Sequence, residues 1–511
     1  MGRISSTALA HRPLIGQLKT ALGKESGGAT SRLHEQLGYA YDAAGNLNYR
    51  TNNALIQNFN VNSLNQISNV TRNATNALTV AGTTTMPATS VTVNGSTATL
   101  YSDSTFAKGG FTPADGSNTY TAIAQDSLSR LDTNSITVYL PTNAVYAYDQ
   151  NGNLTNDSKR VFTYDDENQL TGIVVSNEWK AEFVYDGKMR RRIERNYEWR
   201  SSTWVKTSET RFVYDGNVVL QERNENNTPV VTLTRGKDLS GTLEGAGGIG
   251  GLLAMTENSK LNLQNSSLAH NYFHADGNGN VTMLIDTNQH VAARYIYDPF
   301  GRTLSKSGPL ADVNRYQFSS KPLHDRSGLY DYLYRWYAPE IQRWVNRDPK
   351  RELGFELLRG GSLPRSPIWN RLYVFVRNSP TRWVDPKGLT FMGQDGGCCN
   401  NSSGNEWALV DGEWFLLTPG ACTIDSIFMT DQDCDGMTCG GGFYHVGDFE
   451  EGSCDTPGQD CPVAAPRRWT PSNPGPNSWP PGRPARPGRP GGEHRGSTGR
   501  HEPPPGYPWG T

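Results

Sequence analysis

The fold of this chain is decided by the stretch Tyr39-Ala40-Tyr41-Asp42-Ala43-Ala44-Gly45-Asn46. Its aromatic residue and Tyr-Asp pair alternate as the residues of a half-buried β-strand do. The Gly-Asn pair that follows supplies the positive backbone dihedrals that a tight hairpin turn needs. The same Tyr-Asp pair, again with an aromatic residue two positions earlier, recurs at Tyr148-Asp149, Tyr164-Asp165, Tyr185-Asp186, Tyr214-Asp215 and Tyr297-Asp298.

Each copy of this repeat predicts a strand, a turn and a second strand. A second alternating run follows the turn, as in Val161-Phe162-Thr163-Tyr164. A single hairpin cannot bury its aromatic face alone, so we expect the hairpins to pack side by side in one continuous, curling sheet. We also expect each aspartate to cap its own turn by accepting backbone N–H groups. The predicted fold class is therefore mostly β.

The repeats end at a compact motif between Gly328 and Leu389. It contains Arg343-Trp344-Val345-Asn346-Arg347-Asp348-Pro349 and closes with Asp385-Pro386-Lys387-Gly388-Leu389. Repeats followed by this motif resemble the C-terminal part of the RHS/YD-repeat proteins, with their RHS-associated core domain. That family is related to toxin-complex C subunits, polymorphic toxins and teneurin-like YD shells. The resemblance implies a β-hairpin shell that encloses or displays the polypeptide following the core.

The chain departs from the family pattern in three respects. Ala338 stands where the family usually has Asp, and the stretch 353–368 is longer than the usual link. Only about half a dozen repeats precede the core, which predicts a partial shell.

The composition excludes several classes of protein. The net charge is only −2, so no global attraction to nucleic acid or to an anionic membrane is expected. No apolar run approaches the roughly 20 residues that cross a bilayer. Residues 1–28 contain no standard signal peptide. We therefore expect a fragment of a longer secreted parent, or the relic of a larger gene.

All seven cysteines follow the repeats, between Cys398 and Cys461. A cysteine-free shell with a cysteine-rich appendage is typical of an exported protein whose small appendage is disulfide-bonded. Zinc is the alternative, although the loose cysteine spacing around His445 matches no standard pair of short zinc knuckles. Together with the resemblance, the cysteines favour a secreted or cell-surface location.

Changes in composition divide the chain into segments. The stretch between the two blocks of repeats is rich in Thr, Ala and Val, alternates strongly, and resembles a bacterial Ig-like sandwich. The end of the chain is rich in Pro, Arg and Gly, which favours an extended or disordered tail. The predicted segments are a poorly ordered N-terminus (1–30), YD repeats (31–75), an Ig-like insert (76–140), YD repeats (141–327), the RHS-associated core motif (328–389), a Cys-rich variable region (390–461) and a disordered Pro/Arg/Gly-rich tail (462–511).

The core motif carries the candidate catalytic residues. In the toxin-complex relatives of the family, an aspartyl-type site at the end of the core cleaves the chain, and by resemblance cleavage here follows Leu389. The resemblance assigns the site to Asp348 and Asp385, with a nearby arginine, Arg347 or Arg343, to stabilise the oxyanion. Two carboxylates that share one proton can act as acid and base on a water molecule. The alternative is that both Asp-Pro elements only begin turns.

The candidate metal site is formed by Asp431, Asp433 and Asp435, which precede Gly436. Alternating acids before a glycine fit a calcium loop, because short oxygen ligands suit this hard cation. The twelfth position holds Gly442 in place of the Glu of an EF-hand, and the spacing also resembles the extracellular Excalibur loop. Calcium is thus the one candidate cofactor, and an acidic turn tethered by disulfides is the alternative.

These features favour a secreted or cell-surface YD-repeat scaffold that presents or partly encloses a variable C-terminal tail. The alternative is a self-processing toxin of RHS type that cleaves itself after Leu389 and releases a C-terminal effector. The expected partners are an unknown protein or cell-surface carbohydrate and the chain's own tail, with no specific nucleic acid.

The glycine-rich stretch Gly245–Gly251 lacks the Lys-Ser/Thr of a phosphate loop and is expected to permit close crossing of strands.

Overall fold

The computed structural model describes residues 7–11, 17–26, 28–73, 75, 77–257, 269–347, 373–389, 392–393, 406–410, 413–417 and 467–469. All of them belong to the first of two compact units, Met1–Trp469. Within these residues the regular elements are β-strands and short 3₁₀ turns, which confirms the mostly β prediction. No helix in this part of the chain is long and apolar enough to cross a membrane.

The first large sheet contains the first block of repeats. Its strands run in the order β1-β2-β3-β4-β5-β6-β14, and all neighbouring strands are antiparallel. The bounds are β1 (Thr7–His11), β2 (Leu18–Lys24), β3 (Ser31–Tyr41), β4 (Leu47–Asn52), β5 (Leu55–Val61), β6 (Ile67–Arg72) and β14 (Asn143–Val145).

The N-terminus differs from its prediction. Residues 1–30 were expected to be poorly ordered, yet β1 and β2 extend the sheet beyond β3. The reason is pairing: Ala21 lies opposite Leu37, and Leu18 and Ala21 are buried in the main core. The prediction is therefore wrong for these two strands, because an existing sheet edge orders a segment that is too polar to fold alone.

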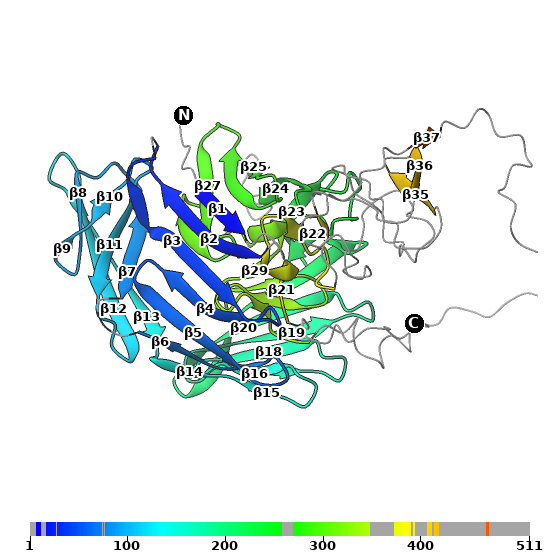
Figure 1. Cartoon of the computed structure of the whole chain (residues 1–511), viewed down its shortest axis with the longest axis horizontal. Helices are drawn as coiled ribbons and strands as arrows, with labels where there is room; N and C mark the ends of the chain where they lie inside the picture. The colour runs from blue at the N-terminus through cyan, green and yellow to red at the C-terminus, as the bar shows by residue number, and fades with distance from the viewer. Residues whose placement is uncertain are drawn as a thin grey trace, which may run out of the picture. The chain divides into compact units, whose positions relative to one another are not determined.

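The second large sheet contains the second block of repeats. In the described part of the chain its strands follow the chain order from β15 to β28 (Figure 1). One residue separates β14 from β15, so a single extended segment passes from the first sheet into the second. The bounds are β15 (Ala147–Tyr148), β16 (Leu154–Asn156), β17 (Val161–Tyr164), β18 (Leu170–Val175), β19 (Trp179–Tyr185), β20 (Arg191–Arg200), β21 (Thr203–Asp215), β22 (Val218–Arg223), β23 (Pro229–Arg235), β24 (Leu252–Glu257), β25 (Ala269–Ala275), β26 (Val281–Asp286), β27 (Val291–Tyr297) and β28 (Thr303–Ser307).

The aspartate of the repeat caps its own turn, as predicted. Its Oδ1 accepts the backbone N–H of the fourth following residue. This bond is 2.8 Å from Asn46 to Asp42, 2.8 Å from Asn153 to Asp149, 2.8 Å from Gln169 to Asp165, 3.1 Å from Arg190 to Asp186 and 3.0 Å from Arg302 to Asp298. Asp215 is the exception, because it pairs with Val218 inside the strand ladder.

The tyrosine of the repeat joins one hairpin to the hairpin before it. Its hydroxyl donates to the carbonyl of the residue that directly follows the previous turn. The bonds run from Tyr164 to Leu154 (3.0 Å), from Tyr185 to Leu170 (2.7 Å), from Tyr214 to Arg191 (2.9 Å) and from Tyr297 to Val281 (2.7 Å). The strand register shifts directly before each of these tyrosines, which bends the strand there.

The insert between the repeats consists of two small sheets over a shared core. Their strand orders are β10-β11-β7 and β13-β12-β8-β9. Val91, Val93, Phe106 and Tyr120 form the centre of this core. The Ig-like assignment of the insert stays a prediction. The bounds are β7 (Leu78–Thr83), β8 (Ser90–Val93), β9 (Ser96–Thr97), β10 (Thr99–Leu100), β11 (Thr105–Phe111), β12 (Gly116–Gln125) and β13 (Leu131–Leu140).

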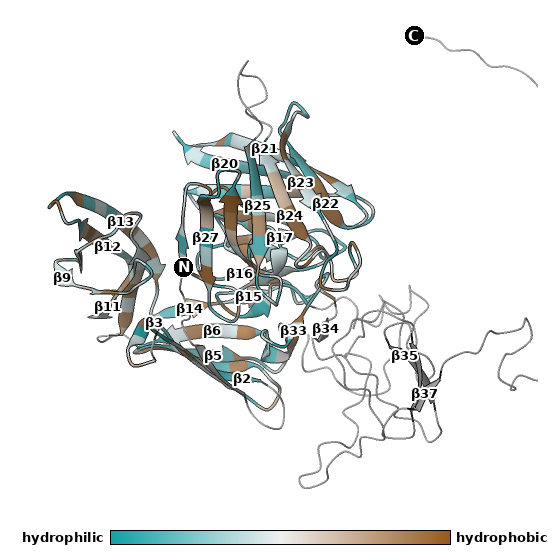
Figure 2. Cartoon of the chain, turned by 90° about the horizontal axis from the view of Figure 1, so that it is seen from above, coloured by the Kyte–Doolittle hydropathy of each residue, from teal (hydrophilic) through white to brown (hydrophobic). Residues whose placement is uncertain are grey.

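The core motif packs against both large sheets through a dense cluster of aromatic rings. Phe375 stacks on Tyr337 at 4.0 Å, and Trp344 meets Tyr332 edge-on at 5.1 Å. Along β19 the buried Trp179, Ala181 and Phe183 alternate with more exposed residues, and Figure 2 shows apolar and polar residues mixed along the strands of the large sheets. The elements of the motif are η1 (Phe318–Ser320), β29 (Leu323–His324), β30 (Leu329–Asp331), β31 (Trp336–Ala338), β32 (Arg343–Trp344), η4 (Val376–Asn378) and β33 (Trp383–Val384), which pairs with β34 (Met392–Gly393).

Turns of both large sheets converge on this motif. Arg343 donates to the Asn46 side chain (2.9 Å), and Asn378 donates to the Gly45 carbonyl (2.7 Å). Tyr373 donates to the Gly152 carbonyl at 2.8 Å. The motif is thus bonded to the hairpin ends as well as packed against the sheets.

A separate three-stranded sheet lies in the C-terminal part of the first unit. It has the order β35-β36-β37, with bounds β35 (Glu406–Val410), β36 (Glu413–Leu417) and β37 (Arg467–Trp469). Its last strand belongs to the segment that was predicted to be the tail.

The tyrosine bond between hairpins predicts a measurable loss of stability. In Tyr185→Phe, the Leu170 carbonyl loses its donor and the Trp336 Nε1–H, which donates to Tyr185 at 3.1 Å, loses its acceptor. We expect the free energy of unfolding, measured in urea, to fall by about 1–3 kcal/mol. Tyr272→Phe, at a side chain that is half exposed, is the matched control and should change it by less than about 0.5 kcal/mol. Equal effects of both changes would contradict the proposed link.

Candidate functional site

The boundary segment Asp385–Leu389, which closes the core motif, is built around a buried aspartate. Asp385 is 2% exposed. Its Oδ1 accepts the backbone N–H groups of Lys387 (3.2 Å), Gly388 (2.7 Å) and Leu389 (3.1 Å). These three bonds wrap the segment around the carboxylate and fix its path up to Leu389.

Arg335 clamps the same segment from the side. Its Nη2 lies 3.5 Å from Asp385 Oδ2, its Nε donates to the Gly388 carbonyl, and its guanidinium lies over the Trp344 ring at 4.2 Å. A Cβ on Gly388 would lie 3.1 Å from Arg335 N and 3.3 Å from Tyr332 Cβ, at a φ of +76°. Only glycine fits this position without strain.

A buried lysine holds the segment from the other direction. Lys321 follows η1 and is 6% exposed. Its Nζ donates to the carbonyl oxygens of Gly247 (2.8 Å) and Pro386. A Cβ on Gly247 would lie 1.9 Å from the Pro386 oxygen. The close approach predicted for the glycine-rich stretch is therefore present, but its partner is the boundary segment instead of a crossing strand.

The electrostatic surroundings of Lys321 favour its neutral form. Burial lowers the pKa of its ammonium to about 7, although the charge of Asp385 acts in the opposite direction. A lysine with this pKa exchanges its proton near neutral pH, whereas an exposed lysine does so near pH 10.

The other predicted catalytic residues have different positions. Arg347 lies beside Gly152, with its Cδ 3.0 Å from where a Cβ would stand, and beside Tyr373. These neighbours differ from those of Asp385, which are Arg335, Lys321 and the following backbone. Asp348 lies outside the described residues, as do Asp431, Asp433, Asp435 and all seven cysteines.

Sequence reasoning missed Arg335 and Lys321. Neither belongs to an Asp-Pro element, and each reaches the boundary segment across more than fifty residues of sequence. The only signal for them was their position inside the core motif and directly before it. Together with Asp385 they form a polar site that can hold the boundary chain, stabilise negative charge and supply or accept a proton near neutral pH.

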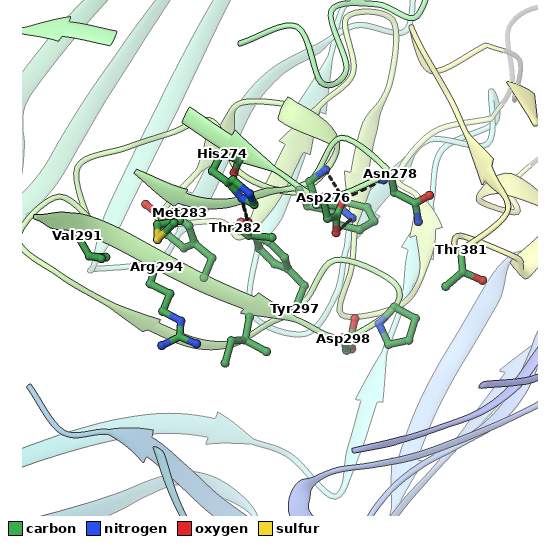
Figure 3. Close-up of a pocket in the computed structure, with 15 residues that line it drawn as sticks. His274, Asp276, Asn278, Thr282, Met283, Val291, Arg294, Tyr297, Asp298 and Thr381 are labelled. Atoms are coloured by element: carbon green, nitrogen blue, oxygen red, sulfur yellow. Dashed lines mark hydrogen bonds between the residues drawn. The ribbon is translucent and has the colours of Figure 1, made fainter. Parts of the chain in front are cut away.

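A cavity of about 640 Å³ lies over β25, β26 and β27 (Figure 3). Its wall includes Thr381, which precedes β33, and the Asp298-Pro299 turn. The cavity holds none of the predicted site residues.

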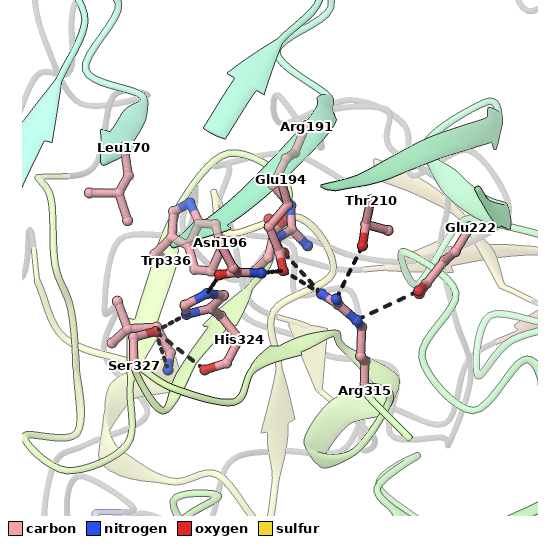
Figure 4. Close-up of polar contacts among 12 residues, drawn as sticks. Leu170, Arg191, Glu194, Asn196, Thr210, Glu222, Arg315, His324, Ser327 and Trp336 are labelled. Atoms are coloured by element: carbon pink, nitrogen blue, oxygen red, sulfur yellow. Dashed lines mark hydrogen bonds and ion pairs between the residues drawn. The ribbon is translucent and has the colours of Figure 1, made fainter. Parts of the chain in front are cut away.

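A buried ionic network fixes the core motif to the second sheet (Figure 4). Glu194 accepts from Arg315 at 2.8 Å and pairs with Arg191, whose Nε lies 3.0 Å from Asp331. Burial by itself would raise the pKa of Glu194, but the charges of Arg315 and Arg191 outweigh it and hold this pKa well below its usual range. Burial also lowers the pKa of His324 to about 4, so its ring is neutral at pH 7.

Comparison with known proteins finds partial similarity to a bacterial nuclease and to a bacterial toxin. No family model matches it. The tRNA3(Ser)-specific nuclease WapA of Bacillus spizizenii is 29% identical over 247 residues, which is 47% of this chain and 9% of that protein. The toxin protein Tse5 of Pseudomonas aeruginosa is 33% identical over 119 residues, which is 23% of this chain and 8% of that protein. The chain thus spans under a tenth of these relatives, which support the RHS- or toxin-complex-like family that the repeats predicted.

Two solved structures align with much of this chain at a low TM-score. TcdB2-TccC3 aligns with 75% of this chain and 18% of its own, at a TM-score of 0.37 and 17% sequence identity. The Photorhabdus luminescens Tc holotoxin pore gives the same values of coverage, TM-score and identity.

The packing around Gly388 predicts that a side chain at this position lowers the stability of the protein by more than the positive φ alone would. In Gly388→Ala, the new Cβ meets Arg335 and Tyr332, whereas in Gly328→Ala, at a φ of +68°, it meets nothing within 4 Å. We expect Gly388→Ala to lower the free energy of unfolding by about 1–3 kcal/mol more than the control. Urea denaturation of both variants measures the difference, and equal losses would show that the boundary segment is not tightly packed.

The lowered pKa of Lys321 predicts a pH-dependent stability. Between about pH 7 and pH 10.5 the unfolded chain binds this proton and the folded chain does not, so stability rises with pH in that window. Lys321→Met should reduce the rise in unfolding free energy between pH 7 and pH 9 by about 2 kcal/mol. The exposed Lys188→Met is the control and should keep the wild-type slope. An unchanged slope in Lys321→Met would mean that this lysine is charged in the folded protein.

Proposed function

We propose that this protein is a toxin-type RHS scaffold whose core motif fixes the boundary at Leu389 and presents the chain that follows it. The observation that carries the proposal is the dedicated clamp around the boundary segment, in which Asp385, Pro386 and Gly388 are buried. Arg335, Lys321 and the Asp385 turn hold five consecutive residues, and two of these contacts involve backbone carbonyl oxygens. A clamp of this kind fixes where the scaffold ends and the downstream polypeptide begins.

The similar proteins support the same proposal. Of the two relatives named above, one is a nuclease by name and the other a toxin, and the repeat region of this chain forms the hairpin sheets that such a scaffold requires. We propose that the scaffold works in a secreted or cell-surface location, with a protein or cell-surface carbohydrate as partner in addition to its own tail. Calcium binding by Asp431, Asp433 and Asp435 remains part of the proposal, and titration of the chain with Ca²⁺ by calorimetry tests it.

The alternative function is self-cleavage after Leu389, and one observation favours it. Asp385 is buried beside a guanidinium and beside a lysine with a pKa of about 7, so one carboxylate, one oxyanion stabiliser and one proton carrier surround the boundary chain. In this mechanism Asp385 pairs with Asp348 to activate water. Arg347 was predicted as the oxyanion stabiliser, and the contacts of Arg335 make it the better candidate for that role.

An intact-mass spectrum of the freshly purified, non-reduced chain distinguishes the two functions. The scaffold predicts one full-length mass, and the mass deficit reports how many of the seven cysteines are bridged. Self-cleavage predicts two fragments that meet at Leu389.

Substitutions extend this measurement. Asp385→Asn keeps an oxygen that can accept the turn bonds but removes the charge, and Asp348→Asn removes the second carboxylate. If self-cleavage occurs, either change should leave a single intact chain. Asp276→Asn, which alters a turn aspartate outside the boundary, is the matched control and should cleave like the wild type. Two fragments from all three variants would exclude the aspartyl mechanism.

A further inference from the structure

The cavity over β25, β26 and β27 is lined by one row of side chains that crosses three strands. His274 lies opposite Met283, and Met283 lies opposite Arg294. Directly opposite residues of antiparallel strands share one face of the sheet, so these three side chains reach the cavity together. The cavity volume of about 640 Å³ lies in the range of small-molecule sites.

Arg294 is the distinctive group in this cavity. It is half-buried, and no acidic side chain or other acceptor among the described residues pairs with its guanidinium. Figure 3 shows the Arg294 side chain apart from Asp276, which bonds to its own turn, and from His274, which bonds to Thr282 at 2.9 Å. A partly dehydrated cation without a partner favours an anionic ligand.

The rest of the wall fixes the character of that anion. Near Arg294 the cavity presents apolar atoms of Met283, Val291 and Ile296, and Tyr297 and Phe318 add aromatic surface. Asp298, which directly follows β27, is fully buried and lies 3.3 Å from Arg302. Asp276, the other acidic residue of the wall, accepts hydrogen bonds from its own turn. Arg294 is the only cation among the described residues of the wall, and the carboxylate of Asp276 adds a negative charge to the same cavity, so a singly charged anion suits the cavity better than a dianion such as phosphate.

We propose that this cavity binds an amphipathic monocarboxylate, with the carboxylate on Arg294 and the apolar body against Met283, Ile296 and Tyr297. A bidentate pair of guanidinium and carboxylate supplies the polar contact and its direction. The side chains of Tyr297 and Phe318 offer aromatic surface to a hydrocarbon or aromatic body. The ligand site is separate from the boundary clamp, and it does not depend on whether the chain cleaves itself.

The test uses octanoate and 3-phenylpropanoate as probes, with octanamide and 3-phenylpropanamide as their neutral counterparts. Binding to the full chain is followed by calorimetry and by the methyl NMR signal of Met283 in protein labelled at its methionines. Met255, buried in the neighbouring core, is the internal reference. We expect each acid to bind at least about tenfold more tightly than its amide and to shift the Met283 signal selectively.

Variants assign the effect to the guanidinium. Arg294→Gln should make acid and amide bind equally weakly, and Arg294→Lys should keep part of the preference for the acid. Arg130→Gln, at an exposed turn of the insert, is the matched control and should bind as the wild type does. Equal affinity of acid and amide for the wild-type chain, no binding of either acid, or an unchanged preference in Arg294→Gln would each overturn the proposal. The comparison of acid and amide needs no variant, so a folding defect in Arg294→Gln leaves the test intact.

Discussion

The structure depends on what the Tyr-Asp pair does with its two polar side chains. The aspartate acts within its own hairpin, where it closes the turn by accepting a backbone N–H four residues later. The tyrosine acts between hairpins, where it donates to the first carbonyl after the preceding turn. One dipeptide thus shapes a hairpin and attaches it to its neighbour. The aspartate and the tyrosine both bond to backbone atoms, so these bonds do not depend on which side chain the partner residue carries.

The core motif depends on the same arrangement. It bonds to the hairpin turns through Arg343, Asn378 and Tyr373. Neighbouring turns are also bonded to each other, as Asn46 is to Asn65 at 2.7 Å. The buried network around Glu194 then joins the motif to the middle of the second sheet. The repeats therefore hold the core motif in place, and within it Arg335 and Lys321 hold the boundary segment through Asp385 and Pro386.

The sequence predicted the elements whose causes are local and missed those whose causes are distant. The hairpins and their aspartate caps follow from residues at most four positions apart, and they were predicted correctly for Asp42 and four other repeats. Which carbonyl accepts each tyrosine hydroxyl depends on the strand register. Bulges at the repeats shift this register, and the spacing of the residues in the sequence does not predict the shift. β1 and β2 were missed because their order comes from pairing with β3, and Arg335 and Lys321 because folding brings them to Asp385 from far along the chain. The catalytic pair itself was proposed from resemblance, and only Asp385 has a described environment.

The way the insert is attached has a consequence for how such proteins diversify. β6 ends at Arg72 and β14 begins at Asn143, yet the two strands are neighbours, and the Arg72 N–H donates to the Thr142 carbonyl at 3.1 Å. The entry and exit of the insert are therefore already joined by the ladder of the first sheet, so the insert lengthens a hairpin loop without interrupting the sheet. Nothing in the ladder specifies what that loop contains. The length of this loop can therefore change while the pairing of β6 with β14 is kept, but the contacts of Arg32 with Asp103 and Thr105 tie the present insert to β3.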